Sequence, residues 1–154
     1  MTIVQRKDGS QLIAGNNGLL RSRDNASGKW LRETLSREGV NPNFIGSSVC
    51  PDGTVVLLAY ENQIWWFKDN WQSSALPTDE EVQAVSCSPL GDIWITGSFS
   101  TILVSRDNFN TWTETSMGED SMLTAITFIS PSKGYIVGEF GLILTTSNGG
   151  DSWE

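Results

Sequence analysis

The fold of this chain is decided by its last repeat, which runs from Gly134 to Trp153 and reads GYIVGEFGLILTTSNGGDSW. Two short apolar runs are joined by a tight glycine turn, and a polar turn then ends on a tryptophan. Apolar runs of this length, separated by turn residues, are typical of short buried strands rather than helices. The repeat therefore predicts antiparallel β-structure.

Three further copies of this repeat precede it, at residues 92–112, 55–71 and 11–30. The copy at 92–112 matches the residue pattern of the last one well, the copy at 11–30 matches it less well, and the copy at 55–71 is degenerate. When Asp24, Asp69, Asp107 and Asn148 are treated as equivalent, the spacings are 45, 38 and 41 residues. Strand-rich repeats with this period are typical of β-propeller blades.

We therefore expect an all-β propeller of about four four-stranded blades, in a single domain spanning 1–154. The predicted blades cover residues 1–41, 42–79, 80–120 and 121–154. Each blade begins with a strand such as 82–86 or 123–128, and the two apolar runs form its second and third strands. The fourth strand should follow the tryptophan. The sequence ends at Glu154, so the last blade is expected to lack its outer strand and to present an unpaired edge that recruits another strand.

The polar turn before each tryptophan resembles the Asp-box, or BNR repeat. The residue pattern of the whole repeat is most similar to the photosystem II stability/assembly-factor branch of that family. The resemblance covers essentially the whole chain. Physically, the Asp or Asn side chain caps backbone N–H groups of its own turn, and the tryptophan should form an apolar plate between neighbouring blades. The predicted Asp-box residues are Ser22, Asp24, Trp30, Asp69, Trp71, Ser105, Asp107, Thr111, Trp112, Asn148, Gly150 and Trp153.

Composition narrows the possible functions. The chain has no histidine, and histidine is the commonest general base and metal ligand. Its net charge of −8 argues against nucleic acid, because phosphate binding depends on Lys and Arg. No apolar run is long enough to insert into a membrane, and the N-terminal residues lack an export signal, which favours a cytoplasmic or virion location.

An enzyme is not expected. Asp-box repeats occur in sialidases, but the arginine triad and the tyrosine–glutamate pair of that family have no counterpart at the matching positions. The sequence also contains no phosphate loop, nucleophile–base pair or metal-ligand cluster. We expect no catalytic residues, no cofactor and no metal.

One face of the propeller is predicted to be strongly acidic. In an up-and-down blade, the turns between the second and third strands share a side with the connections between blades, and this side collects most of the acidic loop residues. Phe99 and Phe140 occupy matching turns there, with Tyr60 close by. These aromatic side chains either anchor a partner or pack against the adjacent blade, and packing is favoured. The candidate partner face comprises Glu38, Glu61, Asp79, Glu80, Glu81, Phe99, Glu119, Asp120, Glu139 and Phe140, and it either binds a basic protein surface or is simply solvated.

The two cysteines, Cys50 and Cys87, are one position out of step when the repeats are aligned. Adjacent positions of a strand point to opposite faces, so we expect two separate buried thiols rather than a disulfide.

These observations favour a non-catalytic structural or protein–protein interaction propeller that works as a homo-oligomer or inside a larger assembly. We favour a phage virion subunit (tail, hub, nozzle or decoration), because short propellers without an export signal resemble such proteins. The alternatives are a binder similar to photosystem II assembly factors, or a glycan-binding lectin-like propeller.

Overall fold

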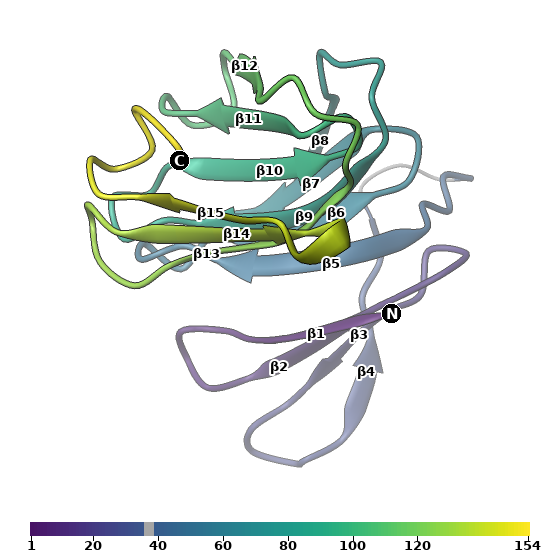
Figure 1. Ribbon diagram of the computed structural model, residues 1–154. Helices are drawn as coiled ribbons and strands as arrows, with labels where there is room; N and C mark the ends of the chain where they lie inside the picture. The colour runs from purple at the N-terminus through teal and green to yellow at the C-terminus, as the bar shows by residue number, and fades with distance from the viewer. Residues whose placement is uncertain (36–38) are drawn as a thin grey trace.

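The computed structural model describes residues 1–35 and 39–154 and consists of four antiparallel sheets in chain order (Figure 1). Glu38 of the candidate partner face lies outside the described residues. Each of the first three sheets has four strands, and the last has three. The all-β propeller prediction is confirmed.

The strands of each sheet pair with their neighbours in sequence, as in an up-and-down blade. The first blade contains β1 (Thr2–Gln5), β2 (Gln11–Ala14), β3 (Leu20–Arg23) and β4 (Trp30–Arg32), and the second contains β5 (Phe44–Val49), β6 (Val55–Ala59), β7 (Gln63–Phe67) and β8 (Trp71–Ala75). The third contains β9 (Val82–Cys87), β10 (Ile93–Gly97), β11 (Thr101–Ser105) and β12 (Thr113–Ser116), and the fourth contains β13 (Leu123–Phe128), β14 (Gly134–Gly138), the short 3-10 turn η1 (Glu139–Gly141) and β15 (Ile143–Thr146).

Three hydrophobic cores lie between successive blades. Leu12 and Leu20 of the first blade meet Leu57 and Trp65 of the second, and corresponding clusters join the second blade to the third and the third to the fourth. The middle strands are apolar on both faces because each middle sheet is covered on both sides. In β6, for example, all five residues are buried.

The inner strands β1, β5, β9 and β13 contact one another in that order. The outward sheet faces of the first and fourth blades nevertheless carry exposed apolar residues, including Ile3 (61% exposed) and Ile143 (62%). Such residues are buried at the junctions between blades, so the four blades form an arc with two uncovered end faces rather than a closed ring.

The outer edge of the fourth blade differs from the expected bare strand. The amide of Thr145 donates to the Glu154 carbonyl at 2.7 Å, and the amide of Glu154 donates back to the Thr145 carbonyl at 3.0 Å. Glu154 therefore occupies the first position of a fourth strand beside β15.

The cysteines form a disulfide, and the expectation of separate thiols was wrong. Cys50 follows β5 and Cys87 ends β9, with their Cα atoms 5.1 Å apart. The alternation argument holds for two strands in one sheet, but these strands belong to stacked sheets. In such a stack, opposite faces of two successive sheets pack on each other. Side chains that differ by one position in the repeat alignment therefore point toward each other.

Candidate functional site

The loops lie at the two opposite ends of the strands, and both ends can be seen in Figure 1. The Asp-box turns lie on the left of this view, together with the turns that join the first and second strands of each blade. The turns joining the second and third strands lie on the right, with the connections between blades. We call the right-hand side the B–C turn side, because it carries the turns between the second and third strands.

The Asp-box of the third blade has the geometry expected of a capped turn. The Asp107 carboxylate accepts hydrogen bonds from the Thr111 amide at 2.9 Å, the Thr111 hydroxyl at 2.5 Å and the Ser105 hydroxyl at 3.1 Å. The Thr111 hydroxyl, then its amide, hold the pKa of Asp107 below its ordinary value. The carboxylate is thus engaged within its own turn.

The fourth blade repeats this arrangement with an amide in place of the carboxylate. The Asn148 side-chain oxygen accepts from the Ser152 amide at 3.1 Å and from the Thr146 hydroxyl at 2.9 Å. The Gly150 amide in turn donates to the Thr146 hydroxyl at 2.9 Å. Trp153 packs edge-on against Trp94 and Phe128 at the junction with the third blade.

The first two Asp-boxes depart from the pattern. Asp24 caps a tighter turn, accepting from the amides of Ala26 and Ser27, and the Ser27 hydroxyl is the main cause of its lowered pKa. Asp69 lies exposed in the turn between β7 and β8, which is shorter than the Asp-box turn between β11 and β12. Ser22, which we expected in the first box, instead faces Glu33 and helps to lower its pKa.

The tryptophans show which way each blade packs. Trp71, Trp112 and Trp153 contribute to the first, second and third inter-blade cores, so each points toward the preceding blade. Trp30 is 41% exposed, because none of the described blades packs against its side of the first blade. Among the described residues, Trp30 therefore does not separate two blades as its equivalents do.

Arginine clamps reinforce two junctions. Arg6 binds both oxygens of Glu33, at 2.7 and 3.0 Å, and Trp71 of the next blade donates to the same carboxylate at 3.2 Å. Burial alone would raise the pKa of Glu33, but the Arg6 hydrogen bonds and charge bring it below its ordinary value. Arg106 joins Asp92 of the third blade to Asp151 of the fourth and lies over the Trp94 ring at 5.3 Å.

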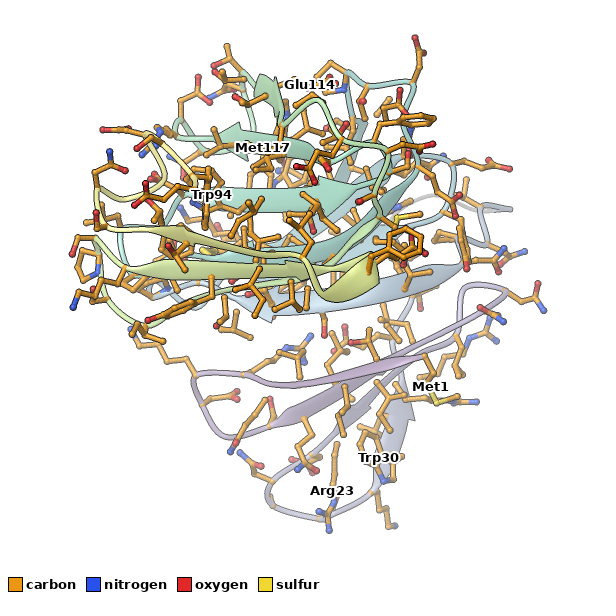
Figure 2. All side chains as sticks on the ribbon, viewed as in Figure 1. Met1, Arg23, Trp30, Trp94, Glu114 and Met117 are labelled. Carbon is orange, nitrogen blue, oxygen red and sulfur yellow. A yellow bond between two sulfur atoms is a disulfide. The ribbon has the colours of Figure 1, made fainter. Side chains whose placement is uncertain are left out.

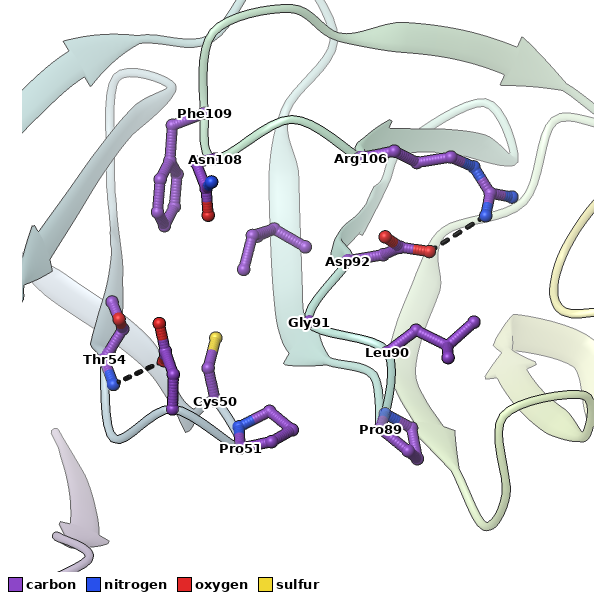
Figure 3. Close-up of a pocket in the computed structure, with 12 residues that line it drawn as sticks. Cys50, Pro51, Thr54, Pro89, Leu90, Gly91, Asp92, Arg106, Asn108 and Phe109 are labelled. Atoms are coloured by element: carbon purple, nitrogen blue, oxygen red, sulfur yellow. Dashed lines mark hydrogen bonds and ion pairs between the residues drawn. The ribbon is translucent and has the colours of Figure 1, made fainter.

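A pocket of about 290 Å³ lies on the Asp-box side between the second and third blades (Figure 3). It is bounded by the Cys50 turn, the Pro89–Asp92 turn, Phe109 and the Arg106–Asp92 ion pair. Its cysteine is in the disulfide, Asp92 is paired with Arg106, and the Asp52 carboxylate accepts a hydrogen bond from the Thr54 amide and pairs with Lys68. In residues 1–35 and 39–154 no group of three or more Cys, Asp or Glu side chains is arranged to hold a metal ion.

The B–C turn side carries exposed aromatic side chains at three matching turns. Tyr60 is 48% exposed, Phe99 is 53% and Phe140 is 91%. Tyr60 and Phe99 thus keep about half of their surface exposed, whereas Phe140 is almost fully exposed. Phe99 and Phe140 also have left-handed backbones, with φ of 50° and 56°, a conformation that bulky residues seldom adopt.

Hydrogen bonds from the connections between blades hold these turns in place. The Ser98 amide donates to the Glu81 carbonyl at 2.8 Å, and the Glu139 amide donates to the Met122 carbonyl at 2.9 Å. The Ser98 hydroxyl donates to the Glu80 carboxylate at 3.0 Å, and the Met122 amide donates to that of Glu139 at 3.2 Å. The candidate acidic residues around the tips are mostly exposed; among the described ones they are Glu61, Asp79, Glu80, Glu81, Glu119, Asp120 and Glu139.

Sequence reasoning placed the aromatic tips on the correct turns and named exposure as one of two alternatives, but it missed their left-handed backbones. Phe99 and Phe140 occupy tips where glycine would be the ordinary residue, so this conformation is seen only in the backbone. It also missed the disulfide and the Arg6–Glu33 clamp. In the described residues, no helix has the length and apolar character needed to cross a membrane.

Comparison with known proteins agrees with this geometry. The sequence is 28% identical over 102 residues to the photosystem II assembly lipoprotein Ycf48 of Synechocystis sp., covering 60% of this chain and 30% of that protein. The structure resembles that of YCF48 bound to D1 peptide, with a TM-score of 0.76, 18% identity and coverage of 99% of this chain and 51% of the other. This chain thus spans about a third of its curated relative and half of that structure.

The fold is also shared with an enzyme. Virginiamycin B lyase from Staphylococcus aureus superposes with a TM-score of 0.68 at 16% identity, covering 96% of this chain and 55% of the lyase. Similarity at this level shows only the architecture, so it does not decide for or against catalysis. The sequence model described as photosynthesis system II assembly factor YCF48 matches residues 64–154, which is more than half of the chain. The chain therefore belongs to the photosystem II assembly factor YCF48 family.

Proposed function

We propose that this arc of blades is a non-catalytic binding module that holds an extended segment of another protein on its B–C turn side, as an assembly factor does for an unassembled subunit. The observation that carries the proposal is the pair of exposed phenylalanines at positive φ, Phe99 and Phe140. Bulky residues in left-handed conformations cost on the order of 1–3 kcal/mol each, and such strain concentrates at functional sites.

The shape and charge of this side suit a peptide better than a small molecule. Tyr60, Phe99 and Phe140 come from three successive blades and are tips rather than walls of a deep cavity. Aromatic anchors spaced along a surface are typical of protein recognition. The acidic residues around them favour a segment with Lys or Arg side chains, whose attraction weakens as salt is added.

Family membership supports a partner from photosystem II. The YCF48 structure that this chain resembles contains a D1 peptide, and the Synechocystis relative is named for photosystem II assembly. None of these comparisons supports the virion or the lectin interpretation, and they favour the assembly-factor alternative. The disulfide also suits an oxidising compartment better than a reducing cytoplasm.

Overlapping synthetic peptides that cover the extramembrane segments of D1 and other photosystem II subunits test the proposal by fluorescence anisotropy. We expect at least one basic peptide to bind, with an affinity that falls as salt rises. Phe140→Ala and Phe99→Ala should each weaken binding about tenfold or more, since hot-spot truncations cost roughly 1.4 kcal/mol or more.

Leu90→Ala is the matched control, because Leu90 is an exposed apolar residue (64%) on the Asp-box side. This variant should bind like the parent chain. If no peptide binds, or if the phenylalanine variants bind as tightly as Leu90→Ala, the proposed site is wrong.

A further inference from the structure

The fourth blade is the last one described, and its outward sheet face corresponds to a face that is buried in the other blades. We call the face that points toward the next blade the forward face. On the fourth blade this face carries Tyr135, Val137 and Ile143, which are 40%, 42% and 62% exposed. Their cross-strand register, with Val137 opposite Ile143, places them side by side on β14 and β15.

In the third blade, the equivalent surface is covered by the next blade. Trp94, Thr96 and Ile102 occupy the equivalent positions of the third blade, and they are 1%, 0% and 2% exposed. They are buried against the rear face of the fourth blade, where Trp94 contacts Phe128 and Trp153. The residue types on the fourth blade are as apolar as these, so this face is not a polar cap of the kind that ends repeat arrays.

The first blade shows the complementary surface at the other end of the arc. Its rear face carries Ile3 and Trp30, which are 61% and 41% exposed. Of the equivalents of Trp30, Trp71 and Trp153 are only 5% and 8% exposed, and Trp112 is partly buried. Figure 2 shows Trp30 with Arg23 on the first blade, away from the other three blades.

We propose that the forward face of the fourth blade docks on the rear face of the first blade in a second copy of this chain. Two copies then form two such junctions around a twofold axis and close a ring of eight blades. Each junction repeats the contact that already joins successive blades, so no new mode of packing is needed. A head-to-tail interface closes in this way when its rotation completes a circle.

The size of related propellers fits this arrangement. This chain covers 51% of the YCF48 structure with bound D1 peptide and 55% of YCF48 from Cyanidioschyzon merolae. Two copies thus contain about as many blades as one complete ring of these relatives. In the proposed dimer, the second copy supplies the other four blades of the ring.

The rear face of the first blade also carries three arginines. The register of the first sheet places Arg21, Arg23 and Arg32 on the same face as Ile3 and Trp30. Within the chain, Arg6 of the first blade lies over the Phe67 ring of the second at 5.5 Å. Arg21 of one copy is suited to make the same kind of contact with Tyr135 of the other.

Light scattering across a concentration series tests the proposal. The 16.9 kDa chain should approach twice that mass as its concentration rises. Ile143→Asp on the forward face and Ile3→Asp on the rear face should each give a monomer. Leu90→Asp is the control, because Leu90 is about as exposed as Ile3 and Ile143 but lies on neither end face. This variant should leave the dimer intact.

Mixing the two monomeric variants separates head-to-tail docking from its alternatives. Ile143→Asp retains an intact rear face and Ile3→Asp retains an intact forward face, so the mixture should form a heterodimer through one junction. Circular dichroism should show that both variants remain folded. If either one unfolds, Tyr135→Lys and Trp30→Lys replace them.

Three results would overturn the proposal. The parent chain could stay a monomer at all concentrations, or its dimer could survive both substitutions. Alternatively, the forward-face substitution could abolish the dimer while the rear-face substitution leaves it intact, which would show that two fourth blades pack against each other. Peptide binding by the Phe99→Ala and Phe140→Ala variants is measured in a separate assay, so failure of the dimer and failure of the peptide site can be told apart.

Discussion

Replacing Gly150 by alanine tests the packing of the last Asp-box against the third blade. Gly150 has φ of +88°, and a Cβ built on it would lie 2.1 Å from the Cη2 atom and 2.4 Å from the Cζ2 atom of Trp94. Trp94 is 1% exposed and is held by Phe128 and Trp153, so it cannot rotate away freely. The new methyl group must therefore push apart the turn and the indole.

Two costs add at this position. A left-handed backbone costs an alanine about 1–2 kcal/mol, and overpacking a well-filled core costs about 1–3 kcal/mol. Gly150→Ala should thus lower the free energy of unfolding by roughly 2–5 kcal/mol. Since each kcal/mol shifts the Tm of a domain this size by about 2–4 °C, the expected decrease in Tm is about 4–20 °C.

Gly91→Ala is the matched control for the backbone cost. Gly91 has the same φ of +88°, but nothing lies within 4 Å of its added Cβ. Urea unfolding of both variants should show that Gly150→Ala is the more destabilising by about 1–3 kcal/mol. In a Trp94→Leu background that excess should disappear, because the atoms that the methyl group strikes are gone.

Equal losses for Gly91→Ala and Gly150→Ala in the parent background would refute the reasoning. An excess that persists in the Trp94→Leu background would place the strain elsewhere in the turn. Either result would mean that the Asp-box is not braced against the third blade as the contacts indicate.

Two further predictions concern the junctions. Reduction of the Cys50–Cys87 disulfide, which spans 37 residues of sequence, should lower the unfolding free energy by roughly 4 kcal/mol in urea titrations; an unchanged midpoint would contradict this. Because Arg6 keeps the pKa of Glu33 below its ordinary value of 4.5, the carboxylate stabilises the fold above pH 4.5 and loses this effect as the pH falls through the lowered pKa. Stability should therefore fall less steeply in Glu33→Gln than in the parent chain below pH 4.5, and parallel curves would argue against the clamp.

The blades were predictable because several local signals agree. Apolar runs, turn residues and a tryptophan recur in the same order, so the strand positions could be read from sequence alone. The Asp107 and Asn148 turns form the expected capped geometry because each contact lies within four residues. Interactions inside a turn depend on little beyond the turn itself.

Contacts between blades were harder to predict. The disulfide was missed because alternation within a sheet was applied to two stacked sheets, where the relation is reversed. Trp30 was assigned to a junction by analogy with its equivalents, although whether a tryptophan is buried depends on its neighbour in space rather than on its motif. Arg6 and Glu33 are 27 residues apart, and no local pattern brings them together.

The structure links the two proposed surfaces. Middle blades are covered on both sheet faces, whereas the fourth blade is covered only on its rear face. In a stack of repeats, each unit is stabilised mainly by its immediate neighbours. Phe99 therefore projects from a blade braced on both sides, and Phe140 from one braced on a single side. Docking of a second copy on Tyr135, Val137 and Ile143 would brace the same sheet that carries Phe140, so closing the ring would also order the most exposed aromatic tip of the peptide-binding side.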